Sequence, residues 1–277
     1  MERRRRGVNR VLISRSVRWK AASLFAFACF ARVPQADAQI HRNPQFVVSA
    51  NTGIQTTVNT RTDRVNFELF AETGNFSATQ NLGRTDVYDI GIAGRLWKRF
   101  RLGAVAAYTR HSSTATIDAK IPHPFFFEFP RMASGVSTKL GHREWAFHLQ
   151  GQYWLPLGEK SILTLFVGPS VFNANQELVT SILTTERGFP FDTVDLVTDT
   201  TEIVGITAMG FNFGFDLSYF GLKQLGFLGK SERLDQLGVA VTARYSRAAP
   251  GIELKGQFQP ALELGGTQIA GGIRVVF

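Results

Sequence analysis

The residues that could do chemistry in this sequence are mainly ionisable side chains set into apolar, alternating stretches. Most of them are flanked by apolar residues, which places them on the minority face of an extended chain. Acids and bases enclosed together in a narrow interior are expected to pair, because unpaired buried charge is costly. The residues predicted to form such a polar lumen network are Asp89, Arg95, Glu144, His148, Asp216, Arg244 and Arg274.

Three interpretations of this network remain open at the level of sequence. The first is a packed polar core, with Gln150, Gln152 and Asn212 between the charges. The second is a salt-bridge gate over a small conduit, and the third is a catalytic acid/base pair. An eight-stranded barrel is only wide enough for its own side chains or one small ligand, which favours the first.

Catalytic and metal-binding patterns are weak elsewhere. In the string His111-Ser112-Ser113, adjacent residues of a strand would point to opposite faces, and no acidic partner is identifiable. His142 and His148 would lie about 20 Å apart along one strand, too far to chelate one metal ion. The sequence therefore predicts no enzymatic activity, no cofactor and no metal site.

The segment Pro122–Pro130 is unusually aromatic, with Phe125, Phe126, Phe127 and Phe129 in one predicted extracellular loop. These side chains could contact a hydrophobic ligand, a protein partner or the acyl chains of lipopolysaccharide. The alternative is a loop that folds over the mouth of a barrel. The basic residues predicted to meet anionic lipid headgroups beside this loop are Lys120, Arg131, Lys139 and Arg143.

Alternation with a period of two dominates the chain that must position these residues. It is clearest in residues 209–219, where Met209, Phe211 and Phe213 alternate with small or polar residues. Similar segments are 46–54, 88–96, 102–108, 145–155, 163–171, 237–246 and 268–277. No segment after residue 38 approaches the roughly 18 consecutive apolar residues of a transmembrane helix.

A soluble β-sandwich also alternates, with its apolar face in the core. Two features favour a membrane barrel instead. The minority face is small and polar, which suits a narrow lumen, and aromatic residues gather at the ends of the segments like an interfacial girdle. These girdle residues are Trp97, Phe100, Tyr153, Trp154, Tyr219, Phe220, Tyr245 and Phe277.

Residues 1–38 have the order of a secretory signal: a basic stretch, an apolar run and the small residues Ala36 and Ala38 before a cleavage site. The whole chain has 31 Lys+Arg and 22 Asp+Glu, a net charge of +9. The leader holds nine of the bases and two of the acids, so 22 bases and 20 acids remain and the net charge falls to +2. Because the excess charge leaves with the leader, a nucleic-acid partner is not indicated. The only cysteine, Cys29, leaves with it.

The predicted fold is all-β: a closed antiparallel transmembrane barrel of eight strands over residues 39–277, following the signal peptide. Long extracellular loops are expected at about 59–84, 112–142, 174–201 and 247–263, with short turns and both termini of the barrel chain on the periplasmic side. The stretch Val65–Phe76 also alternates, so it forms either an external hairpin or two further strands, giving ten.

Three strings carry a resemblance to a known group: Gly271–Phe277, Gly210–Phe220 and Gly238–Arg247. The chain resembles the small outer-membrane β-barrel proteins, a class that includes the OmpA transmembrane domain and OmpW-like barrels. The resemblance implies an outer-membrane location in a Gram-negative-type bacterium and recognition of Phe277 by the barrel-assembly machinery. It departs from OmpA in ending at the last strand, so a peptidoglycan-binding role is not expected.

The expected function is that of an integral outer-membrane barrel with a structural or surface-interaction role and a plugged polar lumen. The alternative is a narrow porin or transporter for small or hydrophobic solutes, and the remote alternative is a lipid-modifying barrel enzyme. The expected partners are outer-membrane lipid, including lipopolysaccharide, and the assembly machinery. The barrel is expected to be a monomer.

Overall fold

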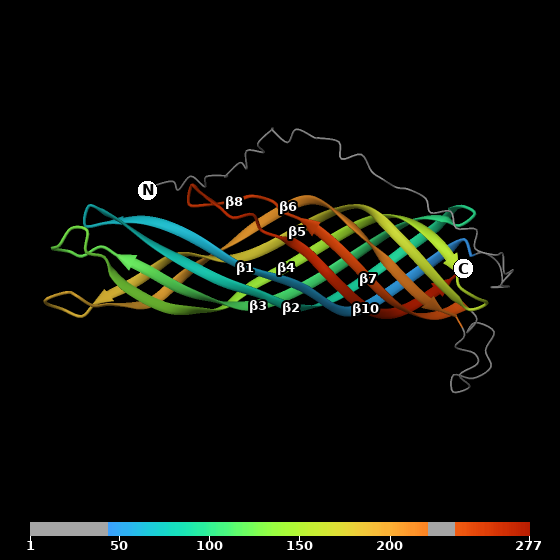
Figure 1. The fold of residues 1–277 in the computed structure, drawn as a ribbon, viewed down its shortest axis with the longest axis horizontal. Coiled ribbons are helices and arrows are strands. Elements are labelled where there is room, and N and C mark those ends of the chain that lie inside the picture. Colours follow the sequence, from blue (N-terminus) through green and yellow to red (C-terminus); the bar gives the residue numbers. More distant parts are fainter. Residues whose placement is uncertain (1–43, 221–235) are drawn as a thin grey trace, which may run out of the picture. The chain divides into compact units, whose positions relative to one another are not determined.

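The computed structural model describes residues 44–220 and 236–277. Eight antiparallel strands close into a barrel in the order β1-β10-β7-β6-β5-β4-β3-β2, and β8 and β9 form a separate hairpin (Figure 1). The predicted eight-stranded barrel is confirmed, and the ten-stranded alternative is wrong. The predicted signal peptide, residues 1–38, lies outside the described range. Within that range, no helix is long and apolar enough to cross a membrane.

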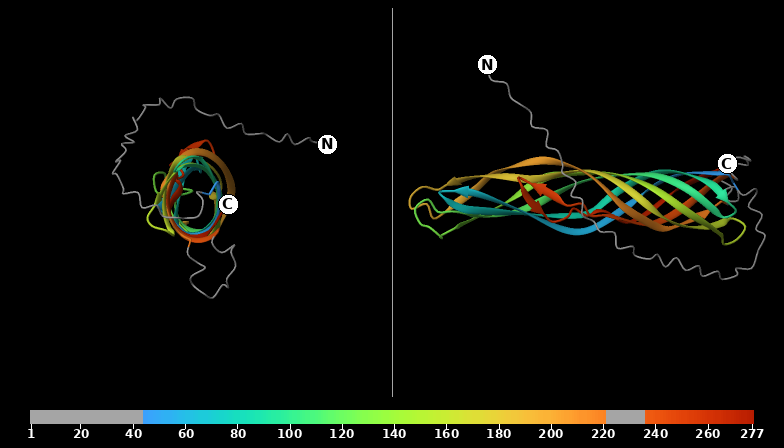
Figure 2. Two further views of the ribbon diagram at one scale, coloured as in Figure 1. Left: turned by 90° about the vertical axis from the view of Figure 1, so that its right-hand side faces the viewer. Right: turned by 90° about the horizontal axis from the view of Figure 1, so that it is seen from above.

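The strands of the barrel are long. They are β1 (Phe46–Leu69), β2 (Glu72–Trp97), β3 (Phe100–Ile121), β4 (Arg131–Pro156), β5 (Ser161–Glu186), β6 (Val194–Tyr219), β7 (Leu237–Ala248), β8 (Ile252–Leu254), β9 (Gln257–Gln259) and β10 (Leu264–Val276). Seen end-on in Figure 2, the eight barrel strands form a closed ring.

The first residue of β1 and the last residue of β10 lie at the same end of the barrel, which we call the terminal end. Phe277 donates its N–H to Phe46 O at 2.9 Å and accepts from Gln45 N at 2.7 Å. The opposite, distal end carries the β1–β2, β3–β4 and β5–β6 connections (Figure 1). We call residues 46–56, 85–110, 144–173, 208–219, 237–248 and 264–276 the terminal half, and residues 59–82, 111–143 and 174–207 the distal half.

The outward face of the terminal half is an apolar belt. On β3, aromatic contacts bound it on both sides: Phe100 lies 4.9 Å from Tyr153, and Tyr108 lies 4.8 Å from Trp145, between ring centroids. The stretch of β3 from Phe100 to Tyr108 is nine residues long. This is close to the roughly 9–11 residues that a tilted strand needs to cross a bilayer. Exposed members of the belt include Val48, Ile90, Ile92, Leu102, Phe147, Leu149, Leu165, Val167, Phe211, Phe213, Phe215, Leu217, Val239, Val241, Ile269 and Ile273.

Most of the sequence predicted to be long loops is strand. The β1–β2 connection is a tight turn at Phe70 and Ala71, both with positive φ, so Val65–Phe76 is the external hairpin of the two alternatives. Residues 112–121, 131–142 and 174–186 extend β3, β4 and β5. The prediction of loops was wrong because the outward residues here are Thr, Ser and Asn, which are typical of loops but also suit a strand exposed to water.

The interior of the distal half is mainly an apolar core, which also encloses the buried ion pair Arg61–Asp63 and the hydrogen-bonded amides of Gln80 and Gln176. Its strands keep the period of two, but apolar side chains point inward, as Ile117 and Ile121 of β3 do. Bulges adjust the phase: the β3–β4 register shifts between Ser113 and Ala115, near Lys139, which has a φ of 67°. This distal core includes Val65, Phe76, Ala78, Leu82, Ala115, Ile117, Ala119, Ile121, Ala133, Leu140, Leu178, Val179, Val194, Ile206, Ile252, Leu254 and Leu262.

The strands β7 and β10 stop short of the distal end, so β1 has no strand partner on one side there. The hairpin β8–β9 covers this edge through side-chain amides. Gln259 Nε2 donates to Arg64 O at 2.8 Å and its Oε1 accepts from Arg64 N at 3.0 Å. Gln257 makes the same pair of bonds with Asn66. The two amides thus replace the backbone of a missing strand.

Candidate functional site

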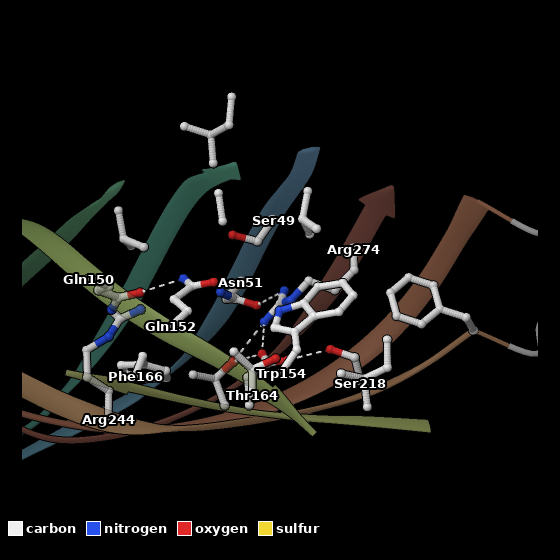
Figure 3. A pocket seen from close by; sticks show the side chains of 18 residues that line it. Ser49, Asn51, Gln150, Gln152, Trp154, Thr164, Phe166, Ser218, Arg244 and Arg274 are labelled. Carbon is white, nitrogen blue, oxygen red and sulfur yellow. Dashed lines mark hydrogen bonds and ion pairs between the residues drawn. The ribbon is translucent and has the colours of Figure 1, made fainter. Parts of the chain in front are cut away.

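Buried ion pairs cross the interior of the terminal half. Asp89 on β2 accepts from Arg244 on β7 at 3.3 Å and from Asn51 Nδ2 at 2.5 Å. Asp216 on β6 accepts from Arg274 on β10. Arg274 also donates to Asn51 Oδ1 at 2.6 Å (Figure 3). One hydrogen-bonded network therefore joins both acids. These four buried charges each have a partner of opposite sign, as low-dielectric surroundings require.

The other two predicted lumen residues on the inner wall, His148 and Glu144, make separate contacts. His148 Nδ1 lies 2.8 Å from Ser170 Oγ, which in turn accepts from Asn212 Nδ2 at 2.9 Å. Glu144 Oε2 accepts from Gly265 N at 3.2 Å. Six of the seven predicted lumen residues are thus buried inside the barrel: Asp89, Glu144, His148, Asp216, Arg244 and Arg274.

Arg95 differs from the other predicted lumen residues, and Arg101 was missed. Arg95 is half-buried at the terminal end, in register with Arg101 on β3. Arg101 is the buried arginine at this level, 2% exposed: it donates to Pro44 O at 2.6 Å, and its guanidinium lies 3.6 Å from the centre of the Trp154 ring. Counting by twos from Asp89 on β2 reaches Arg95, and the same count along β3 reaches Arg101, which sequence reasoning did not consider. The inward phase of Gly103 and Val105 on the same strand is the signal that would have identified Arg101.

A small cavity lies inside the terminal half. It has a volume of about 50 Å³ and is lined by Asn51, Gln150, Arg244 and Arg274 among other residues (Figure 3). A buried water needs about 10–15 Å³ measured in this way, so the cavity has room for a few waters and no larger solute.

Candidate catalytic residues do not assemble. His111 is half-buried, Ser112 is exposed and Ser113 is buried, so the two serines point to opposite faces, as predicted. Ser113 Oγ accepts from Gln80 Nε2 at 2.5 Å. Among the described residues, no group of three or more His, Cys, Asp or Glu side chains is placed to hold a metal ion.

The phenylalanines of the β3–β4 connection are exposed at the distal end of the barrel. Phe125, Phe126, Phe127 and Phe129 are 57–74% exposed. The β5–β6 connection adds Phe189, which is 87% exposed, and Phe191, whose ring lies 5.6 Å from that of Phe125. We call these six residues the aromatic tip. The β5–β6 connection lies in the predicted loop 174–201, but its phenylalanines were not singled out from the sequence, although the string Gly188-Phe189-Pro190-Phe191 signals them.

Arg131 holds the two loops of the aromatic tip together. It donates to Pro122 O at 2.7 Å, to Phe191 O at 2.8 Å and to Glu186 Oε1 at 2.9 Å. The prediction that Arg131 meets lipid headgroups is therefore wrong, because its side chain is buried in these contacts. The other three basic residues of that prediction, Lys120, Lys139 and Arg143, are exposed.

No protein-family model and no curated protein matches the chain. Solved structures with some similarity include Neisserial surface protein A, with a TM-score of 0.39 and 12% identity over 84% of this chain and 97% of that one. Ail, the attachment invasion locus protein of Yersinia pestis, has a TM-score of 0.34 and 10% identity over 83% and 99%. The outer membrane protease OmpT of Escherichia coli has a TM-score of 0.40 and 10% identity over 84% and 97%. These values carry no activity over to this chain.

The architecture is recognisable from the chain's own residues. A closed antiparallel barrel with an apolar outer belt, aromatic residues at both edges of the belt and a polar interior is the arrangement of a small outer-membrane β-barrel protein.

Proposed function

We propose that this chain is a non-conducting outer-membrane barrel that displays a rigid distal half and its aromatic tip to partners outside the cell. The observation that carries the proposal is the filled interior. In the terminal half, the network around Asp89 and Asp216 occupies the lumen. In the distal half, the apolar core closes the path beyond it. A solute would have to displace both.

Recording from the refolded protein in a planar lipid bilayer tests this proposal. Insertion is verified separately by heat-modifiable gel migration, which reports a folded barrel. We expect no single-channel steps. Steady steps would support the alternative of a narrow transporter and overturn a plugged barrel. Recovery of the exported protein in the cytosolic fraction would contradict the outer-membrane assignment itself.

We propose lipopolysaccharide headgroups as the lipid contact of the belt's distal edge. Arg143 is exposed two residues beyond Trp145 on the outward face of β4, and Arg110 lies opposite it on β3. Guanidinium groups just above an aromatic girdle lie at the level where anionic headgroups begin. Replacing both arginines with Ala should weaken lipopolysaccharide binding by the purified protein, with Lys139→Ala as the matched control. Unchanged binding would overturn the assignment.

We also propose that Phe277 is the contact for the barrel-assembly machinery and that the barrel is a monomer. Phe277 is exposed at the terminal end while its backbone is paired with Phe46. In the terminal half, every barrel strand pairs on both sides, so the ring needs no second chain. Phe277→Ser should slow assembly in cells, with Phe46→Ser as the control, and light scattering in detergent should give one chain per particle.

A further inference from the structure

We propose that the aromatic tip docks onto a lipid surface facing the distal end of the barrel, and that it prefers zwitterionic over anionic headgroups. This inference rests on the surface-interaction role proposed above and names the partner class. It is carried by the exposure of the rings, the hydrogen bonding of the loop backbone and the sign of the exposed charges.

The rings of the aromatic tip protrude and are poorly covered by the protein. Five of the six are more than half exposed, up to 87% for Phe189. An exposed apolar cluster of this kind marks an interaction site. Protruding rings require a partner that closes around them, and the fluid acyl region at a bilayer surface does so without a matching shape.

Most backbone N–H groups of the β3–β4 connection are hydrogen-bonded within the protein or replaced by proline. Such a backbone suits an apolar medium, where an unbonded N–H costs several kcal/mol. His123 is buried, and its Nδ1 accepts from Phe125 N at 3.1 Å and Phe126 N at 3.2 Å. Glu128 N donates to Glu72 Oε1 at 2.7 Å. Three of the nine residues of this connection are prolines, which have no N–H. Together with the three bonded N–H groups, six of the nine backbone positions need no hydrogen bond to water.

Several polar backbone groups of the β5–β6 connection are likewise hydrogen-bonded within the protein. Phe191 N donates to Gly188 O at 2.7 Å, Pro190 has no N–H, and Phe191 O accepts from buried Arg131. Because Arg131 also binds the other loop, both loops are fixed before contact, which lowers the entropy lost on docking. A loop that only faced water would not need its polar groups satisfied internally.

The exposed charges at the tip are mainly acidic. Glu128 is exposed between Phe127 and Phe129, and Asp192 lies beside the second loop. Of the cations near the tip, Arg131 pairs with Glu186 and Arg187 with Asp195 at 2.5 Å, and Lys120 is exposed two residues before the first loop. An anionic lipid surface would therefore repel the tip. The Glu128 carboxylate would stay at the headgroups and limit insertion to the rings.

Vesicle flotation tests the proposal. The full-length protein, reconstituted in nanodiscs, is mixed with protein-free phosphatidylcholine vesicles and the bound fraction is measured. Phe126→Ser combined with Phe127→Ser should reduce the apparent affinity by at least about tenfold. The matched control is Phe258→Ser, which removes a ring that is 90% exposed on the β8–β9 hairpin, away from the tip (Figure 1); its binding should not change.

The charge component has its own test. Adding phosphatidylserine to the vesicles should weaken binding, and Glu128→Gln should reduce that loss. Absence of wild-type flotation with phosphatidylcholine, or an equal loss in Phe258→Ser, would overturn the proposal. Capture that requires a protein in the vesicle would also overturn it, in favour of a protein partner, while leaving the surface role intact. The conductance experiment bears on the filled barrel alone, so the two proposals can fail separately.

Discussion

The terminal and distal halves use the same strands with polar and apolar side chains exchanged between the inside and the outside. On β3, Leu102 and Ala104 face outward in the terminal half, whereas Thr116 and Asp118 face outward in the distal half and Ile117 faces inward. The period of two is common to both. The exchange follows from the surroundings, which are hydrocarbon around one half and water around the other.

The two interiors are consequently held together by different interactions. The terminal half relies on ion pairs and hydrogen bonds that are strong only when complete. The distal half relies mainly on apolar packing, as in a soluble domain, together with the buried Arg61–Asp63 pair. The comparison teaches that the barrel is a membrane anchor continued, without a linker, into a water-exposed β-domain.

The largest expected effect is from breaking an ion pair of the terminal half. Arg274→Met leaves Asp216 buried without its cation and should cost about 3–5 kcal/mol of unfolding free energy. Urea unfolding of the folded protein in lipid vesicles, followed by tryptophan fluorescence, measures it. Adding Asp216→Leu to the same chain should recover most of the loss. If the double variant is as unstable as Arg274→Met, the pair is not the source of the effect.

An arginine placed on the outward face should lower the free energy of unfolding much more in the terminal half than in the distal half. Ala104→Arg places a charge in the apolar belt and should cost about 2–4 kcal/mol. Thr116→Arg, on the same face of β3 in the distal half, should change stability by no more than about 0.5 kcal/mol. The same unfolding measurement compares them. Equal losses would show that the distal half does not face water, contradicting the exchange between halves.

The terminal half could be predicted from sequence because lipid demands an uninterrupted apolar face. The segment Met209–Tyr219 has no outward residue that a loop would favour, so its strand was evident. Most of the polar lumen followed from the same count, because inward charges such as Asp89 and Asp216 lie between outward apolar residues, although Glu144 has exposed Arg143 on one side. Arg101 was missed although the same count along β3 places it inward, between outward Phe100 and Leu102.

The distal half was hidden from sequence for two physical reasons. Its outward Thr and Asn residues resemble a loop, and its phase changes at bulges that period counting cannot detect, as near Lys139. The contacts of the tip depend on long-range pairs, such as Arg131 with Phe191 O. No local pattern indicates that a basic loop residue will be buried by a loop about 60 positions later.

A smaller effect is expected from the covered edge of the distal half. Gln257→Ala with Gln259→Ala removes four hydrogen bonds to the β1 backbone. It should cost about 1–3 kcal/mol in total and raise amide hydrogen exchange at Arg64 and Asn66. Terminal-half amides should be unaffected and serve as the internal reference. Unchanged exchange at Arg64 would show that the two amides do not hold this edge.

The smallest effect concerns Glu177, which joins three strands of the distal half. Thr201 Oγ1 donates to its carboxylate at 2.6 Å and Gly141 N at 3.0 Å, and these bonds hold the pKa of Glu177 below its ordinary value. A carboxyl with a lowered folded-state pKa adds stability above its unfolded pKa of about 4.3, and loses it as the pH falls through the folded value. Glu177→Gln should therefore cost up to about 1 kcal/mol at neutral pH and progressively less in acid. Glu202→Gln removes the same charge from neighbouring β6 and is the matched control. A difference in unfolding free energy between wild type and Glu177→Gln that stays constant with pH would contradict the assignment. Such a difference would arise from changed packing and not from loss of the charged carboxylate.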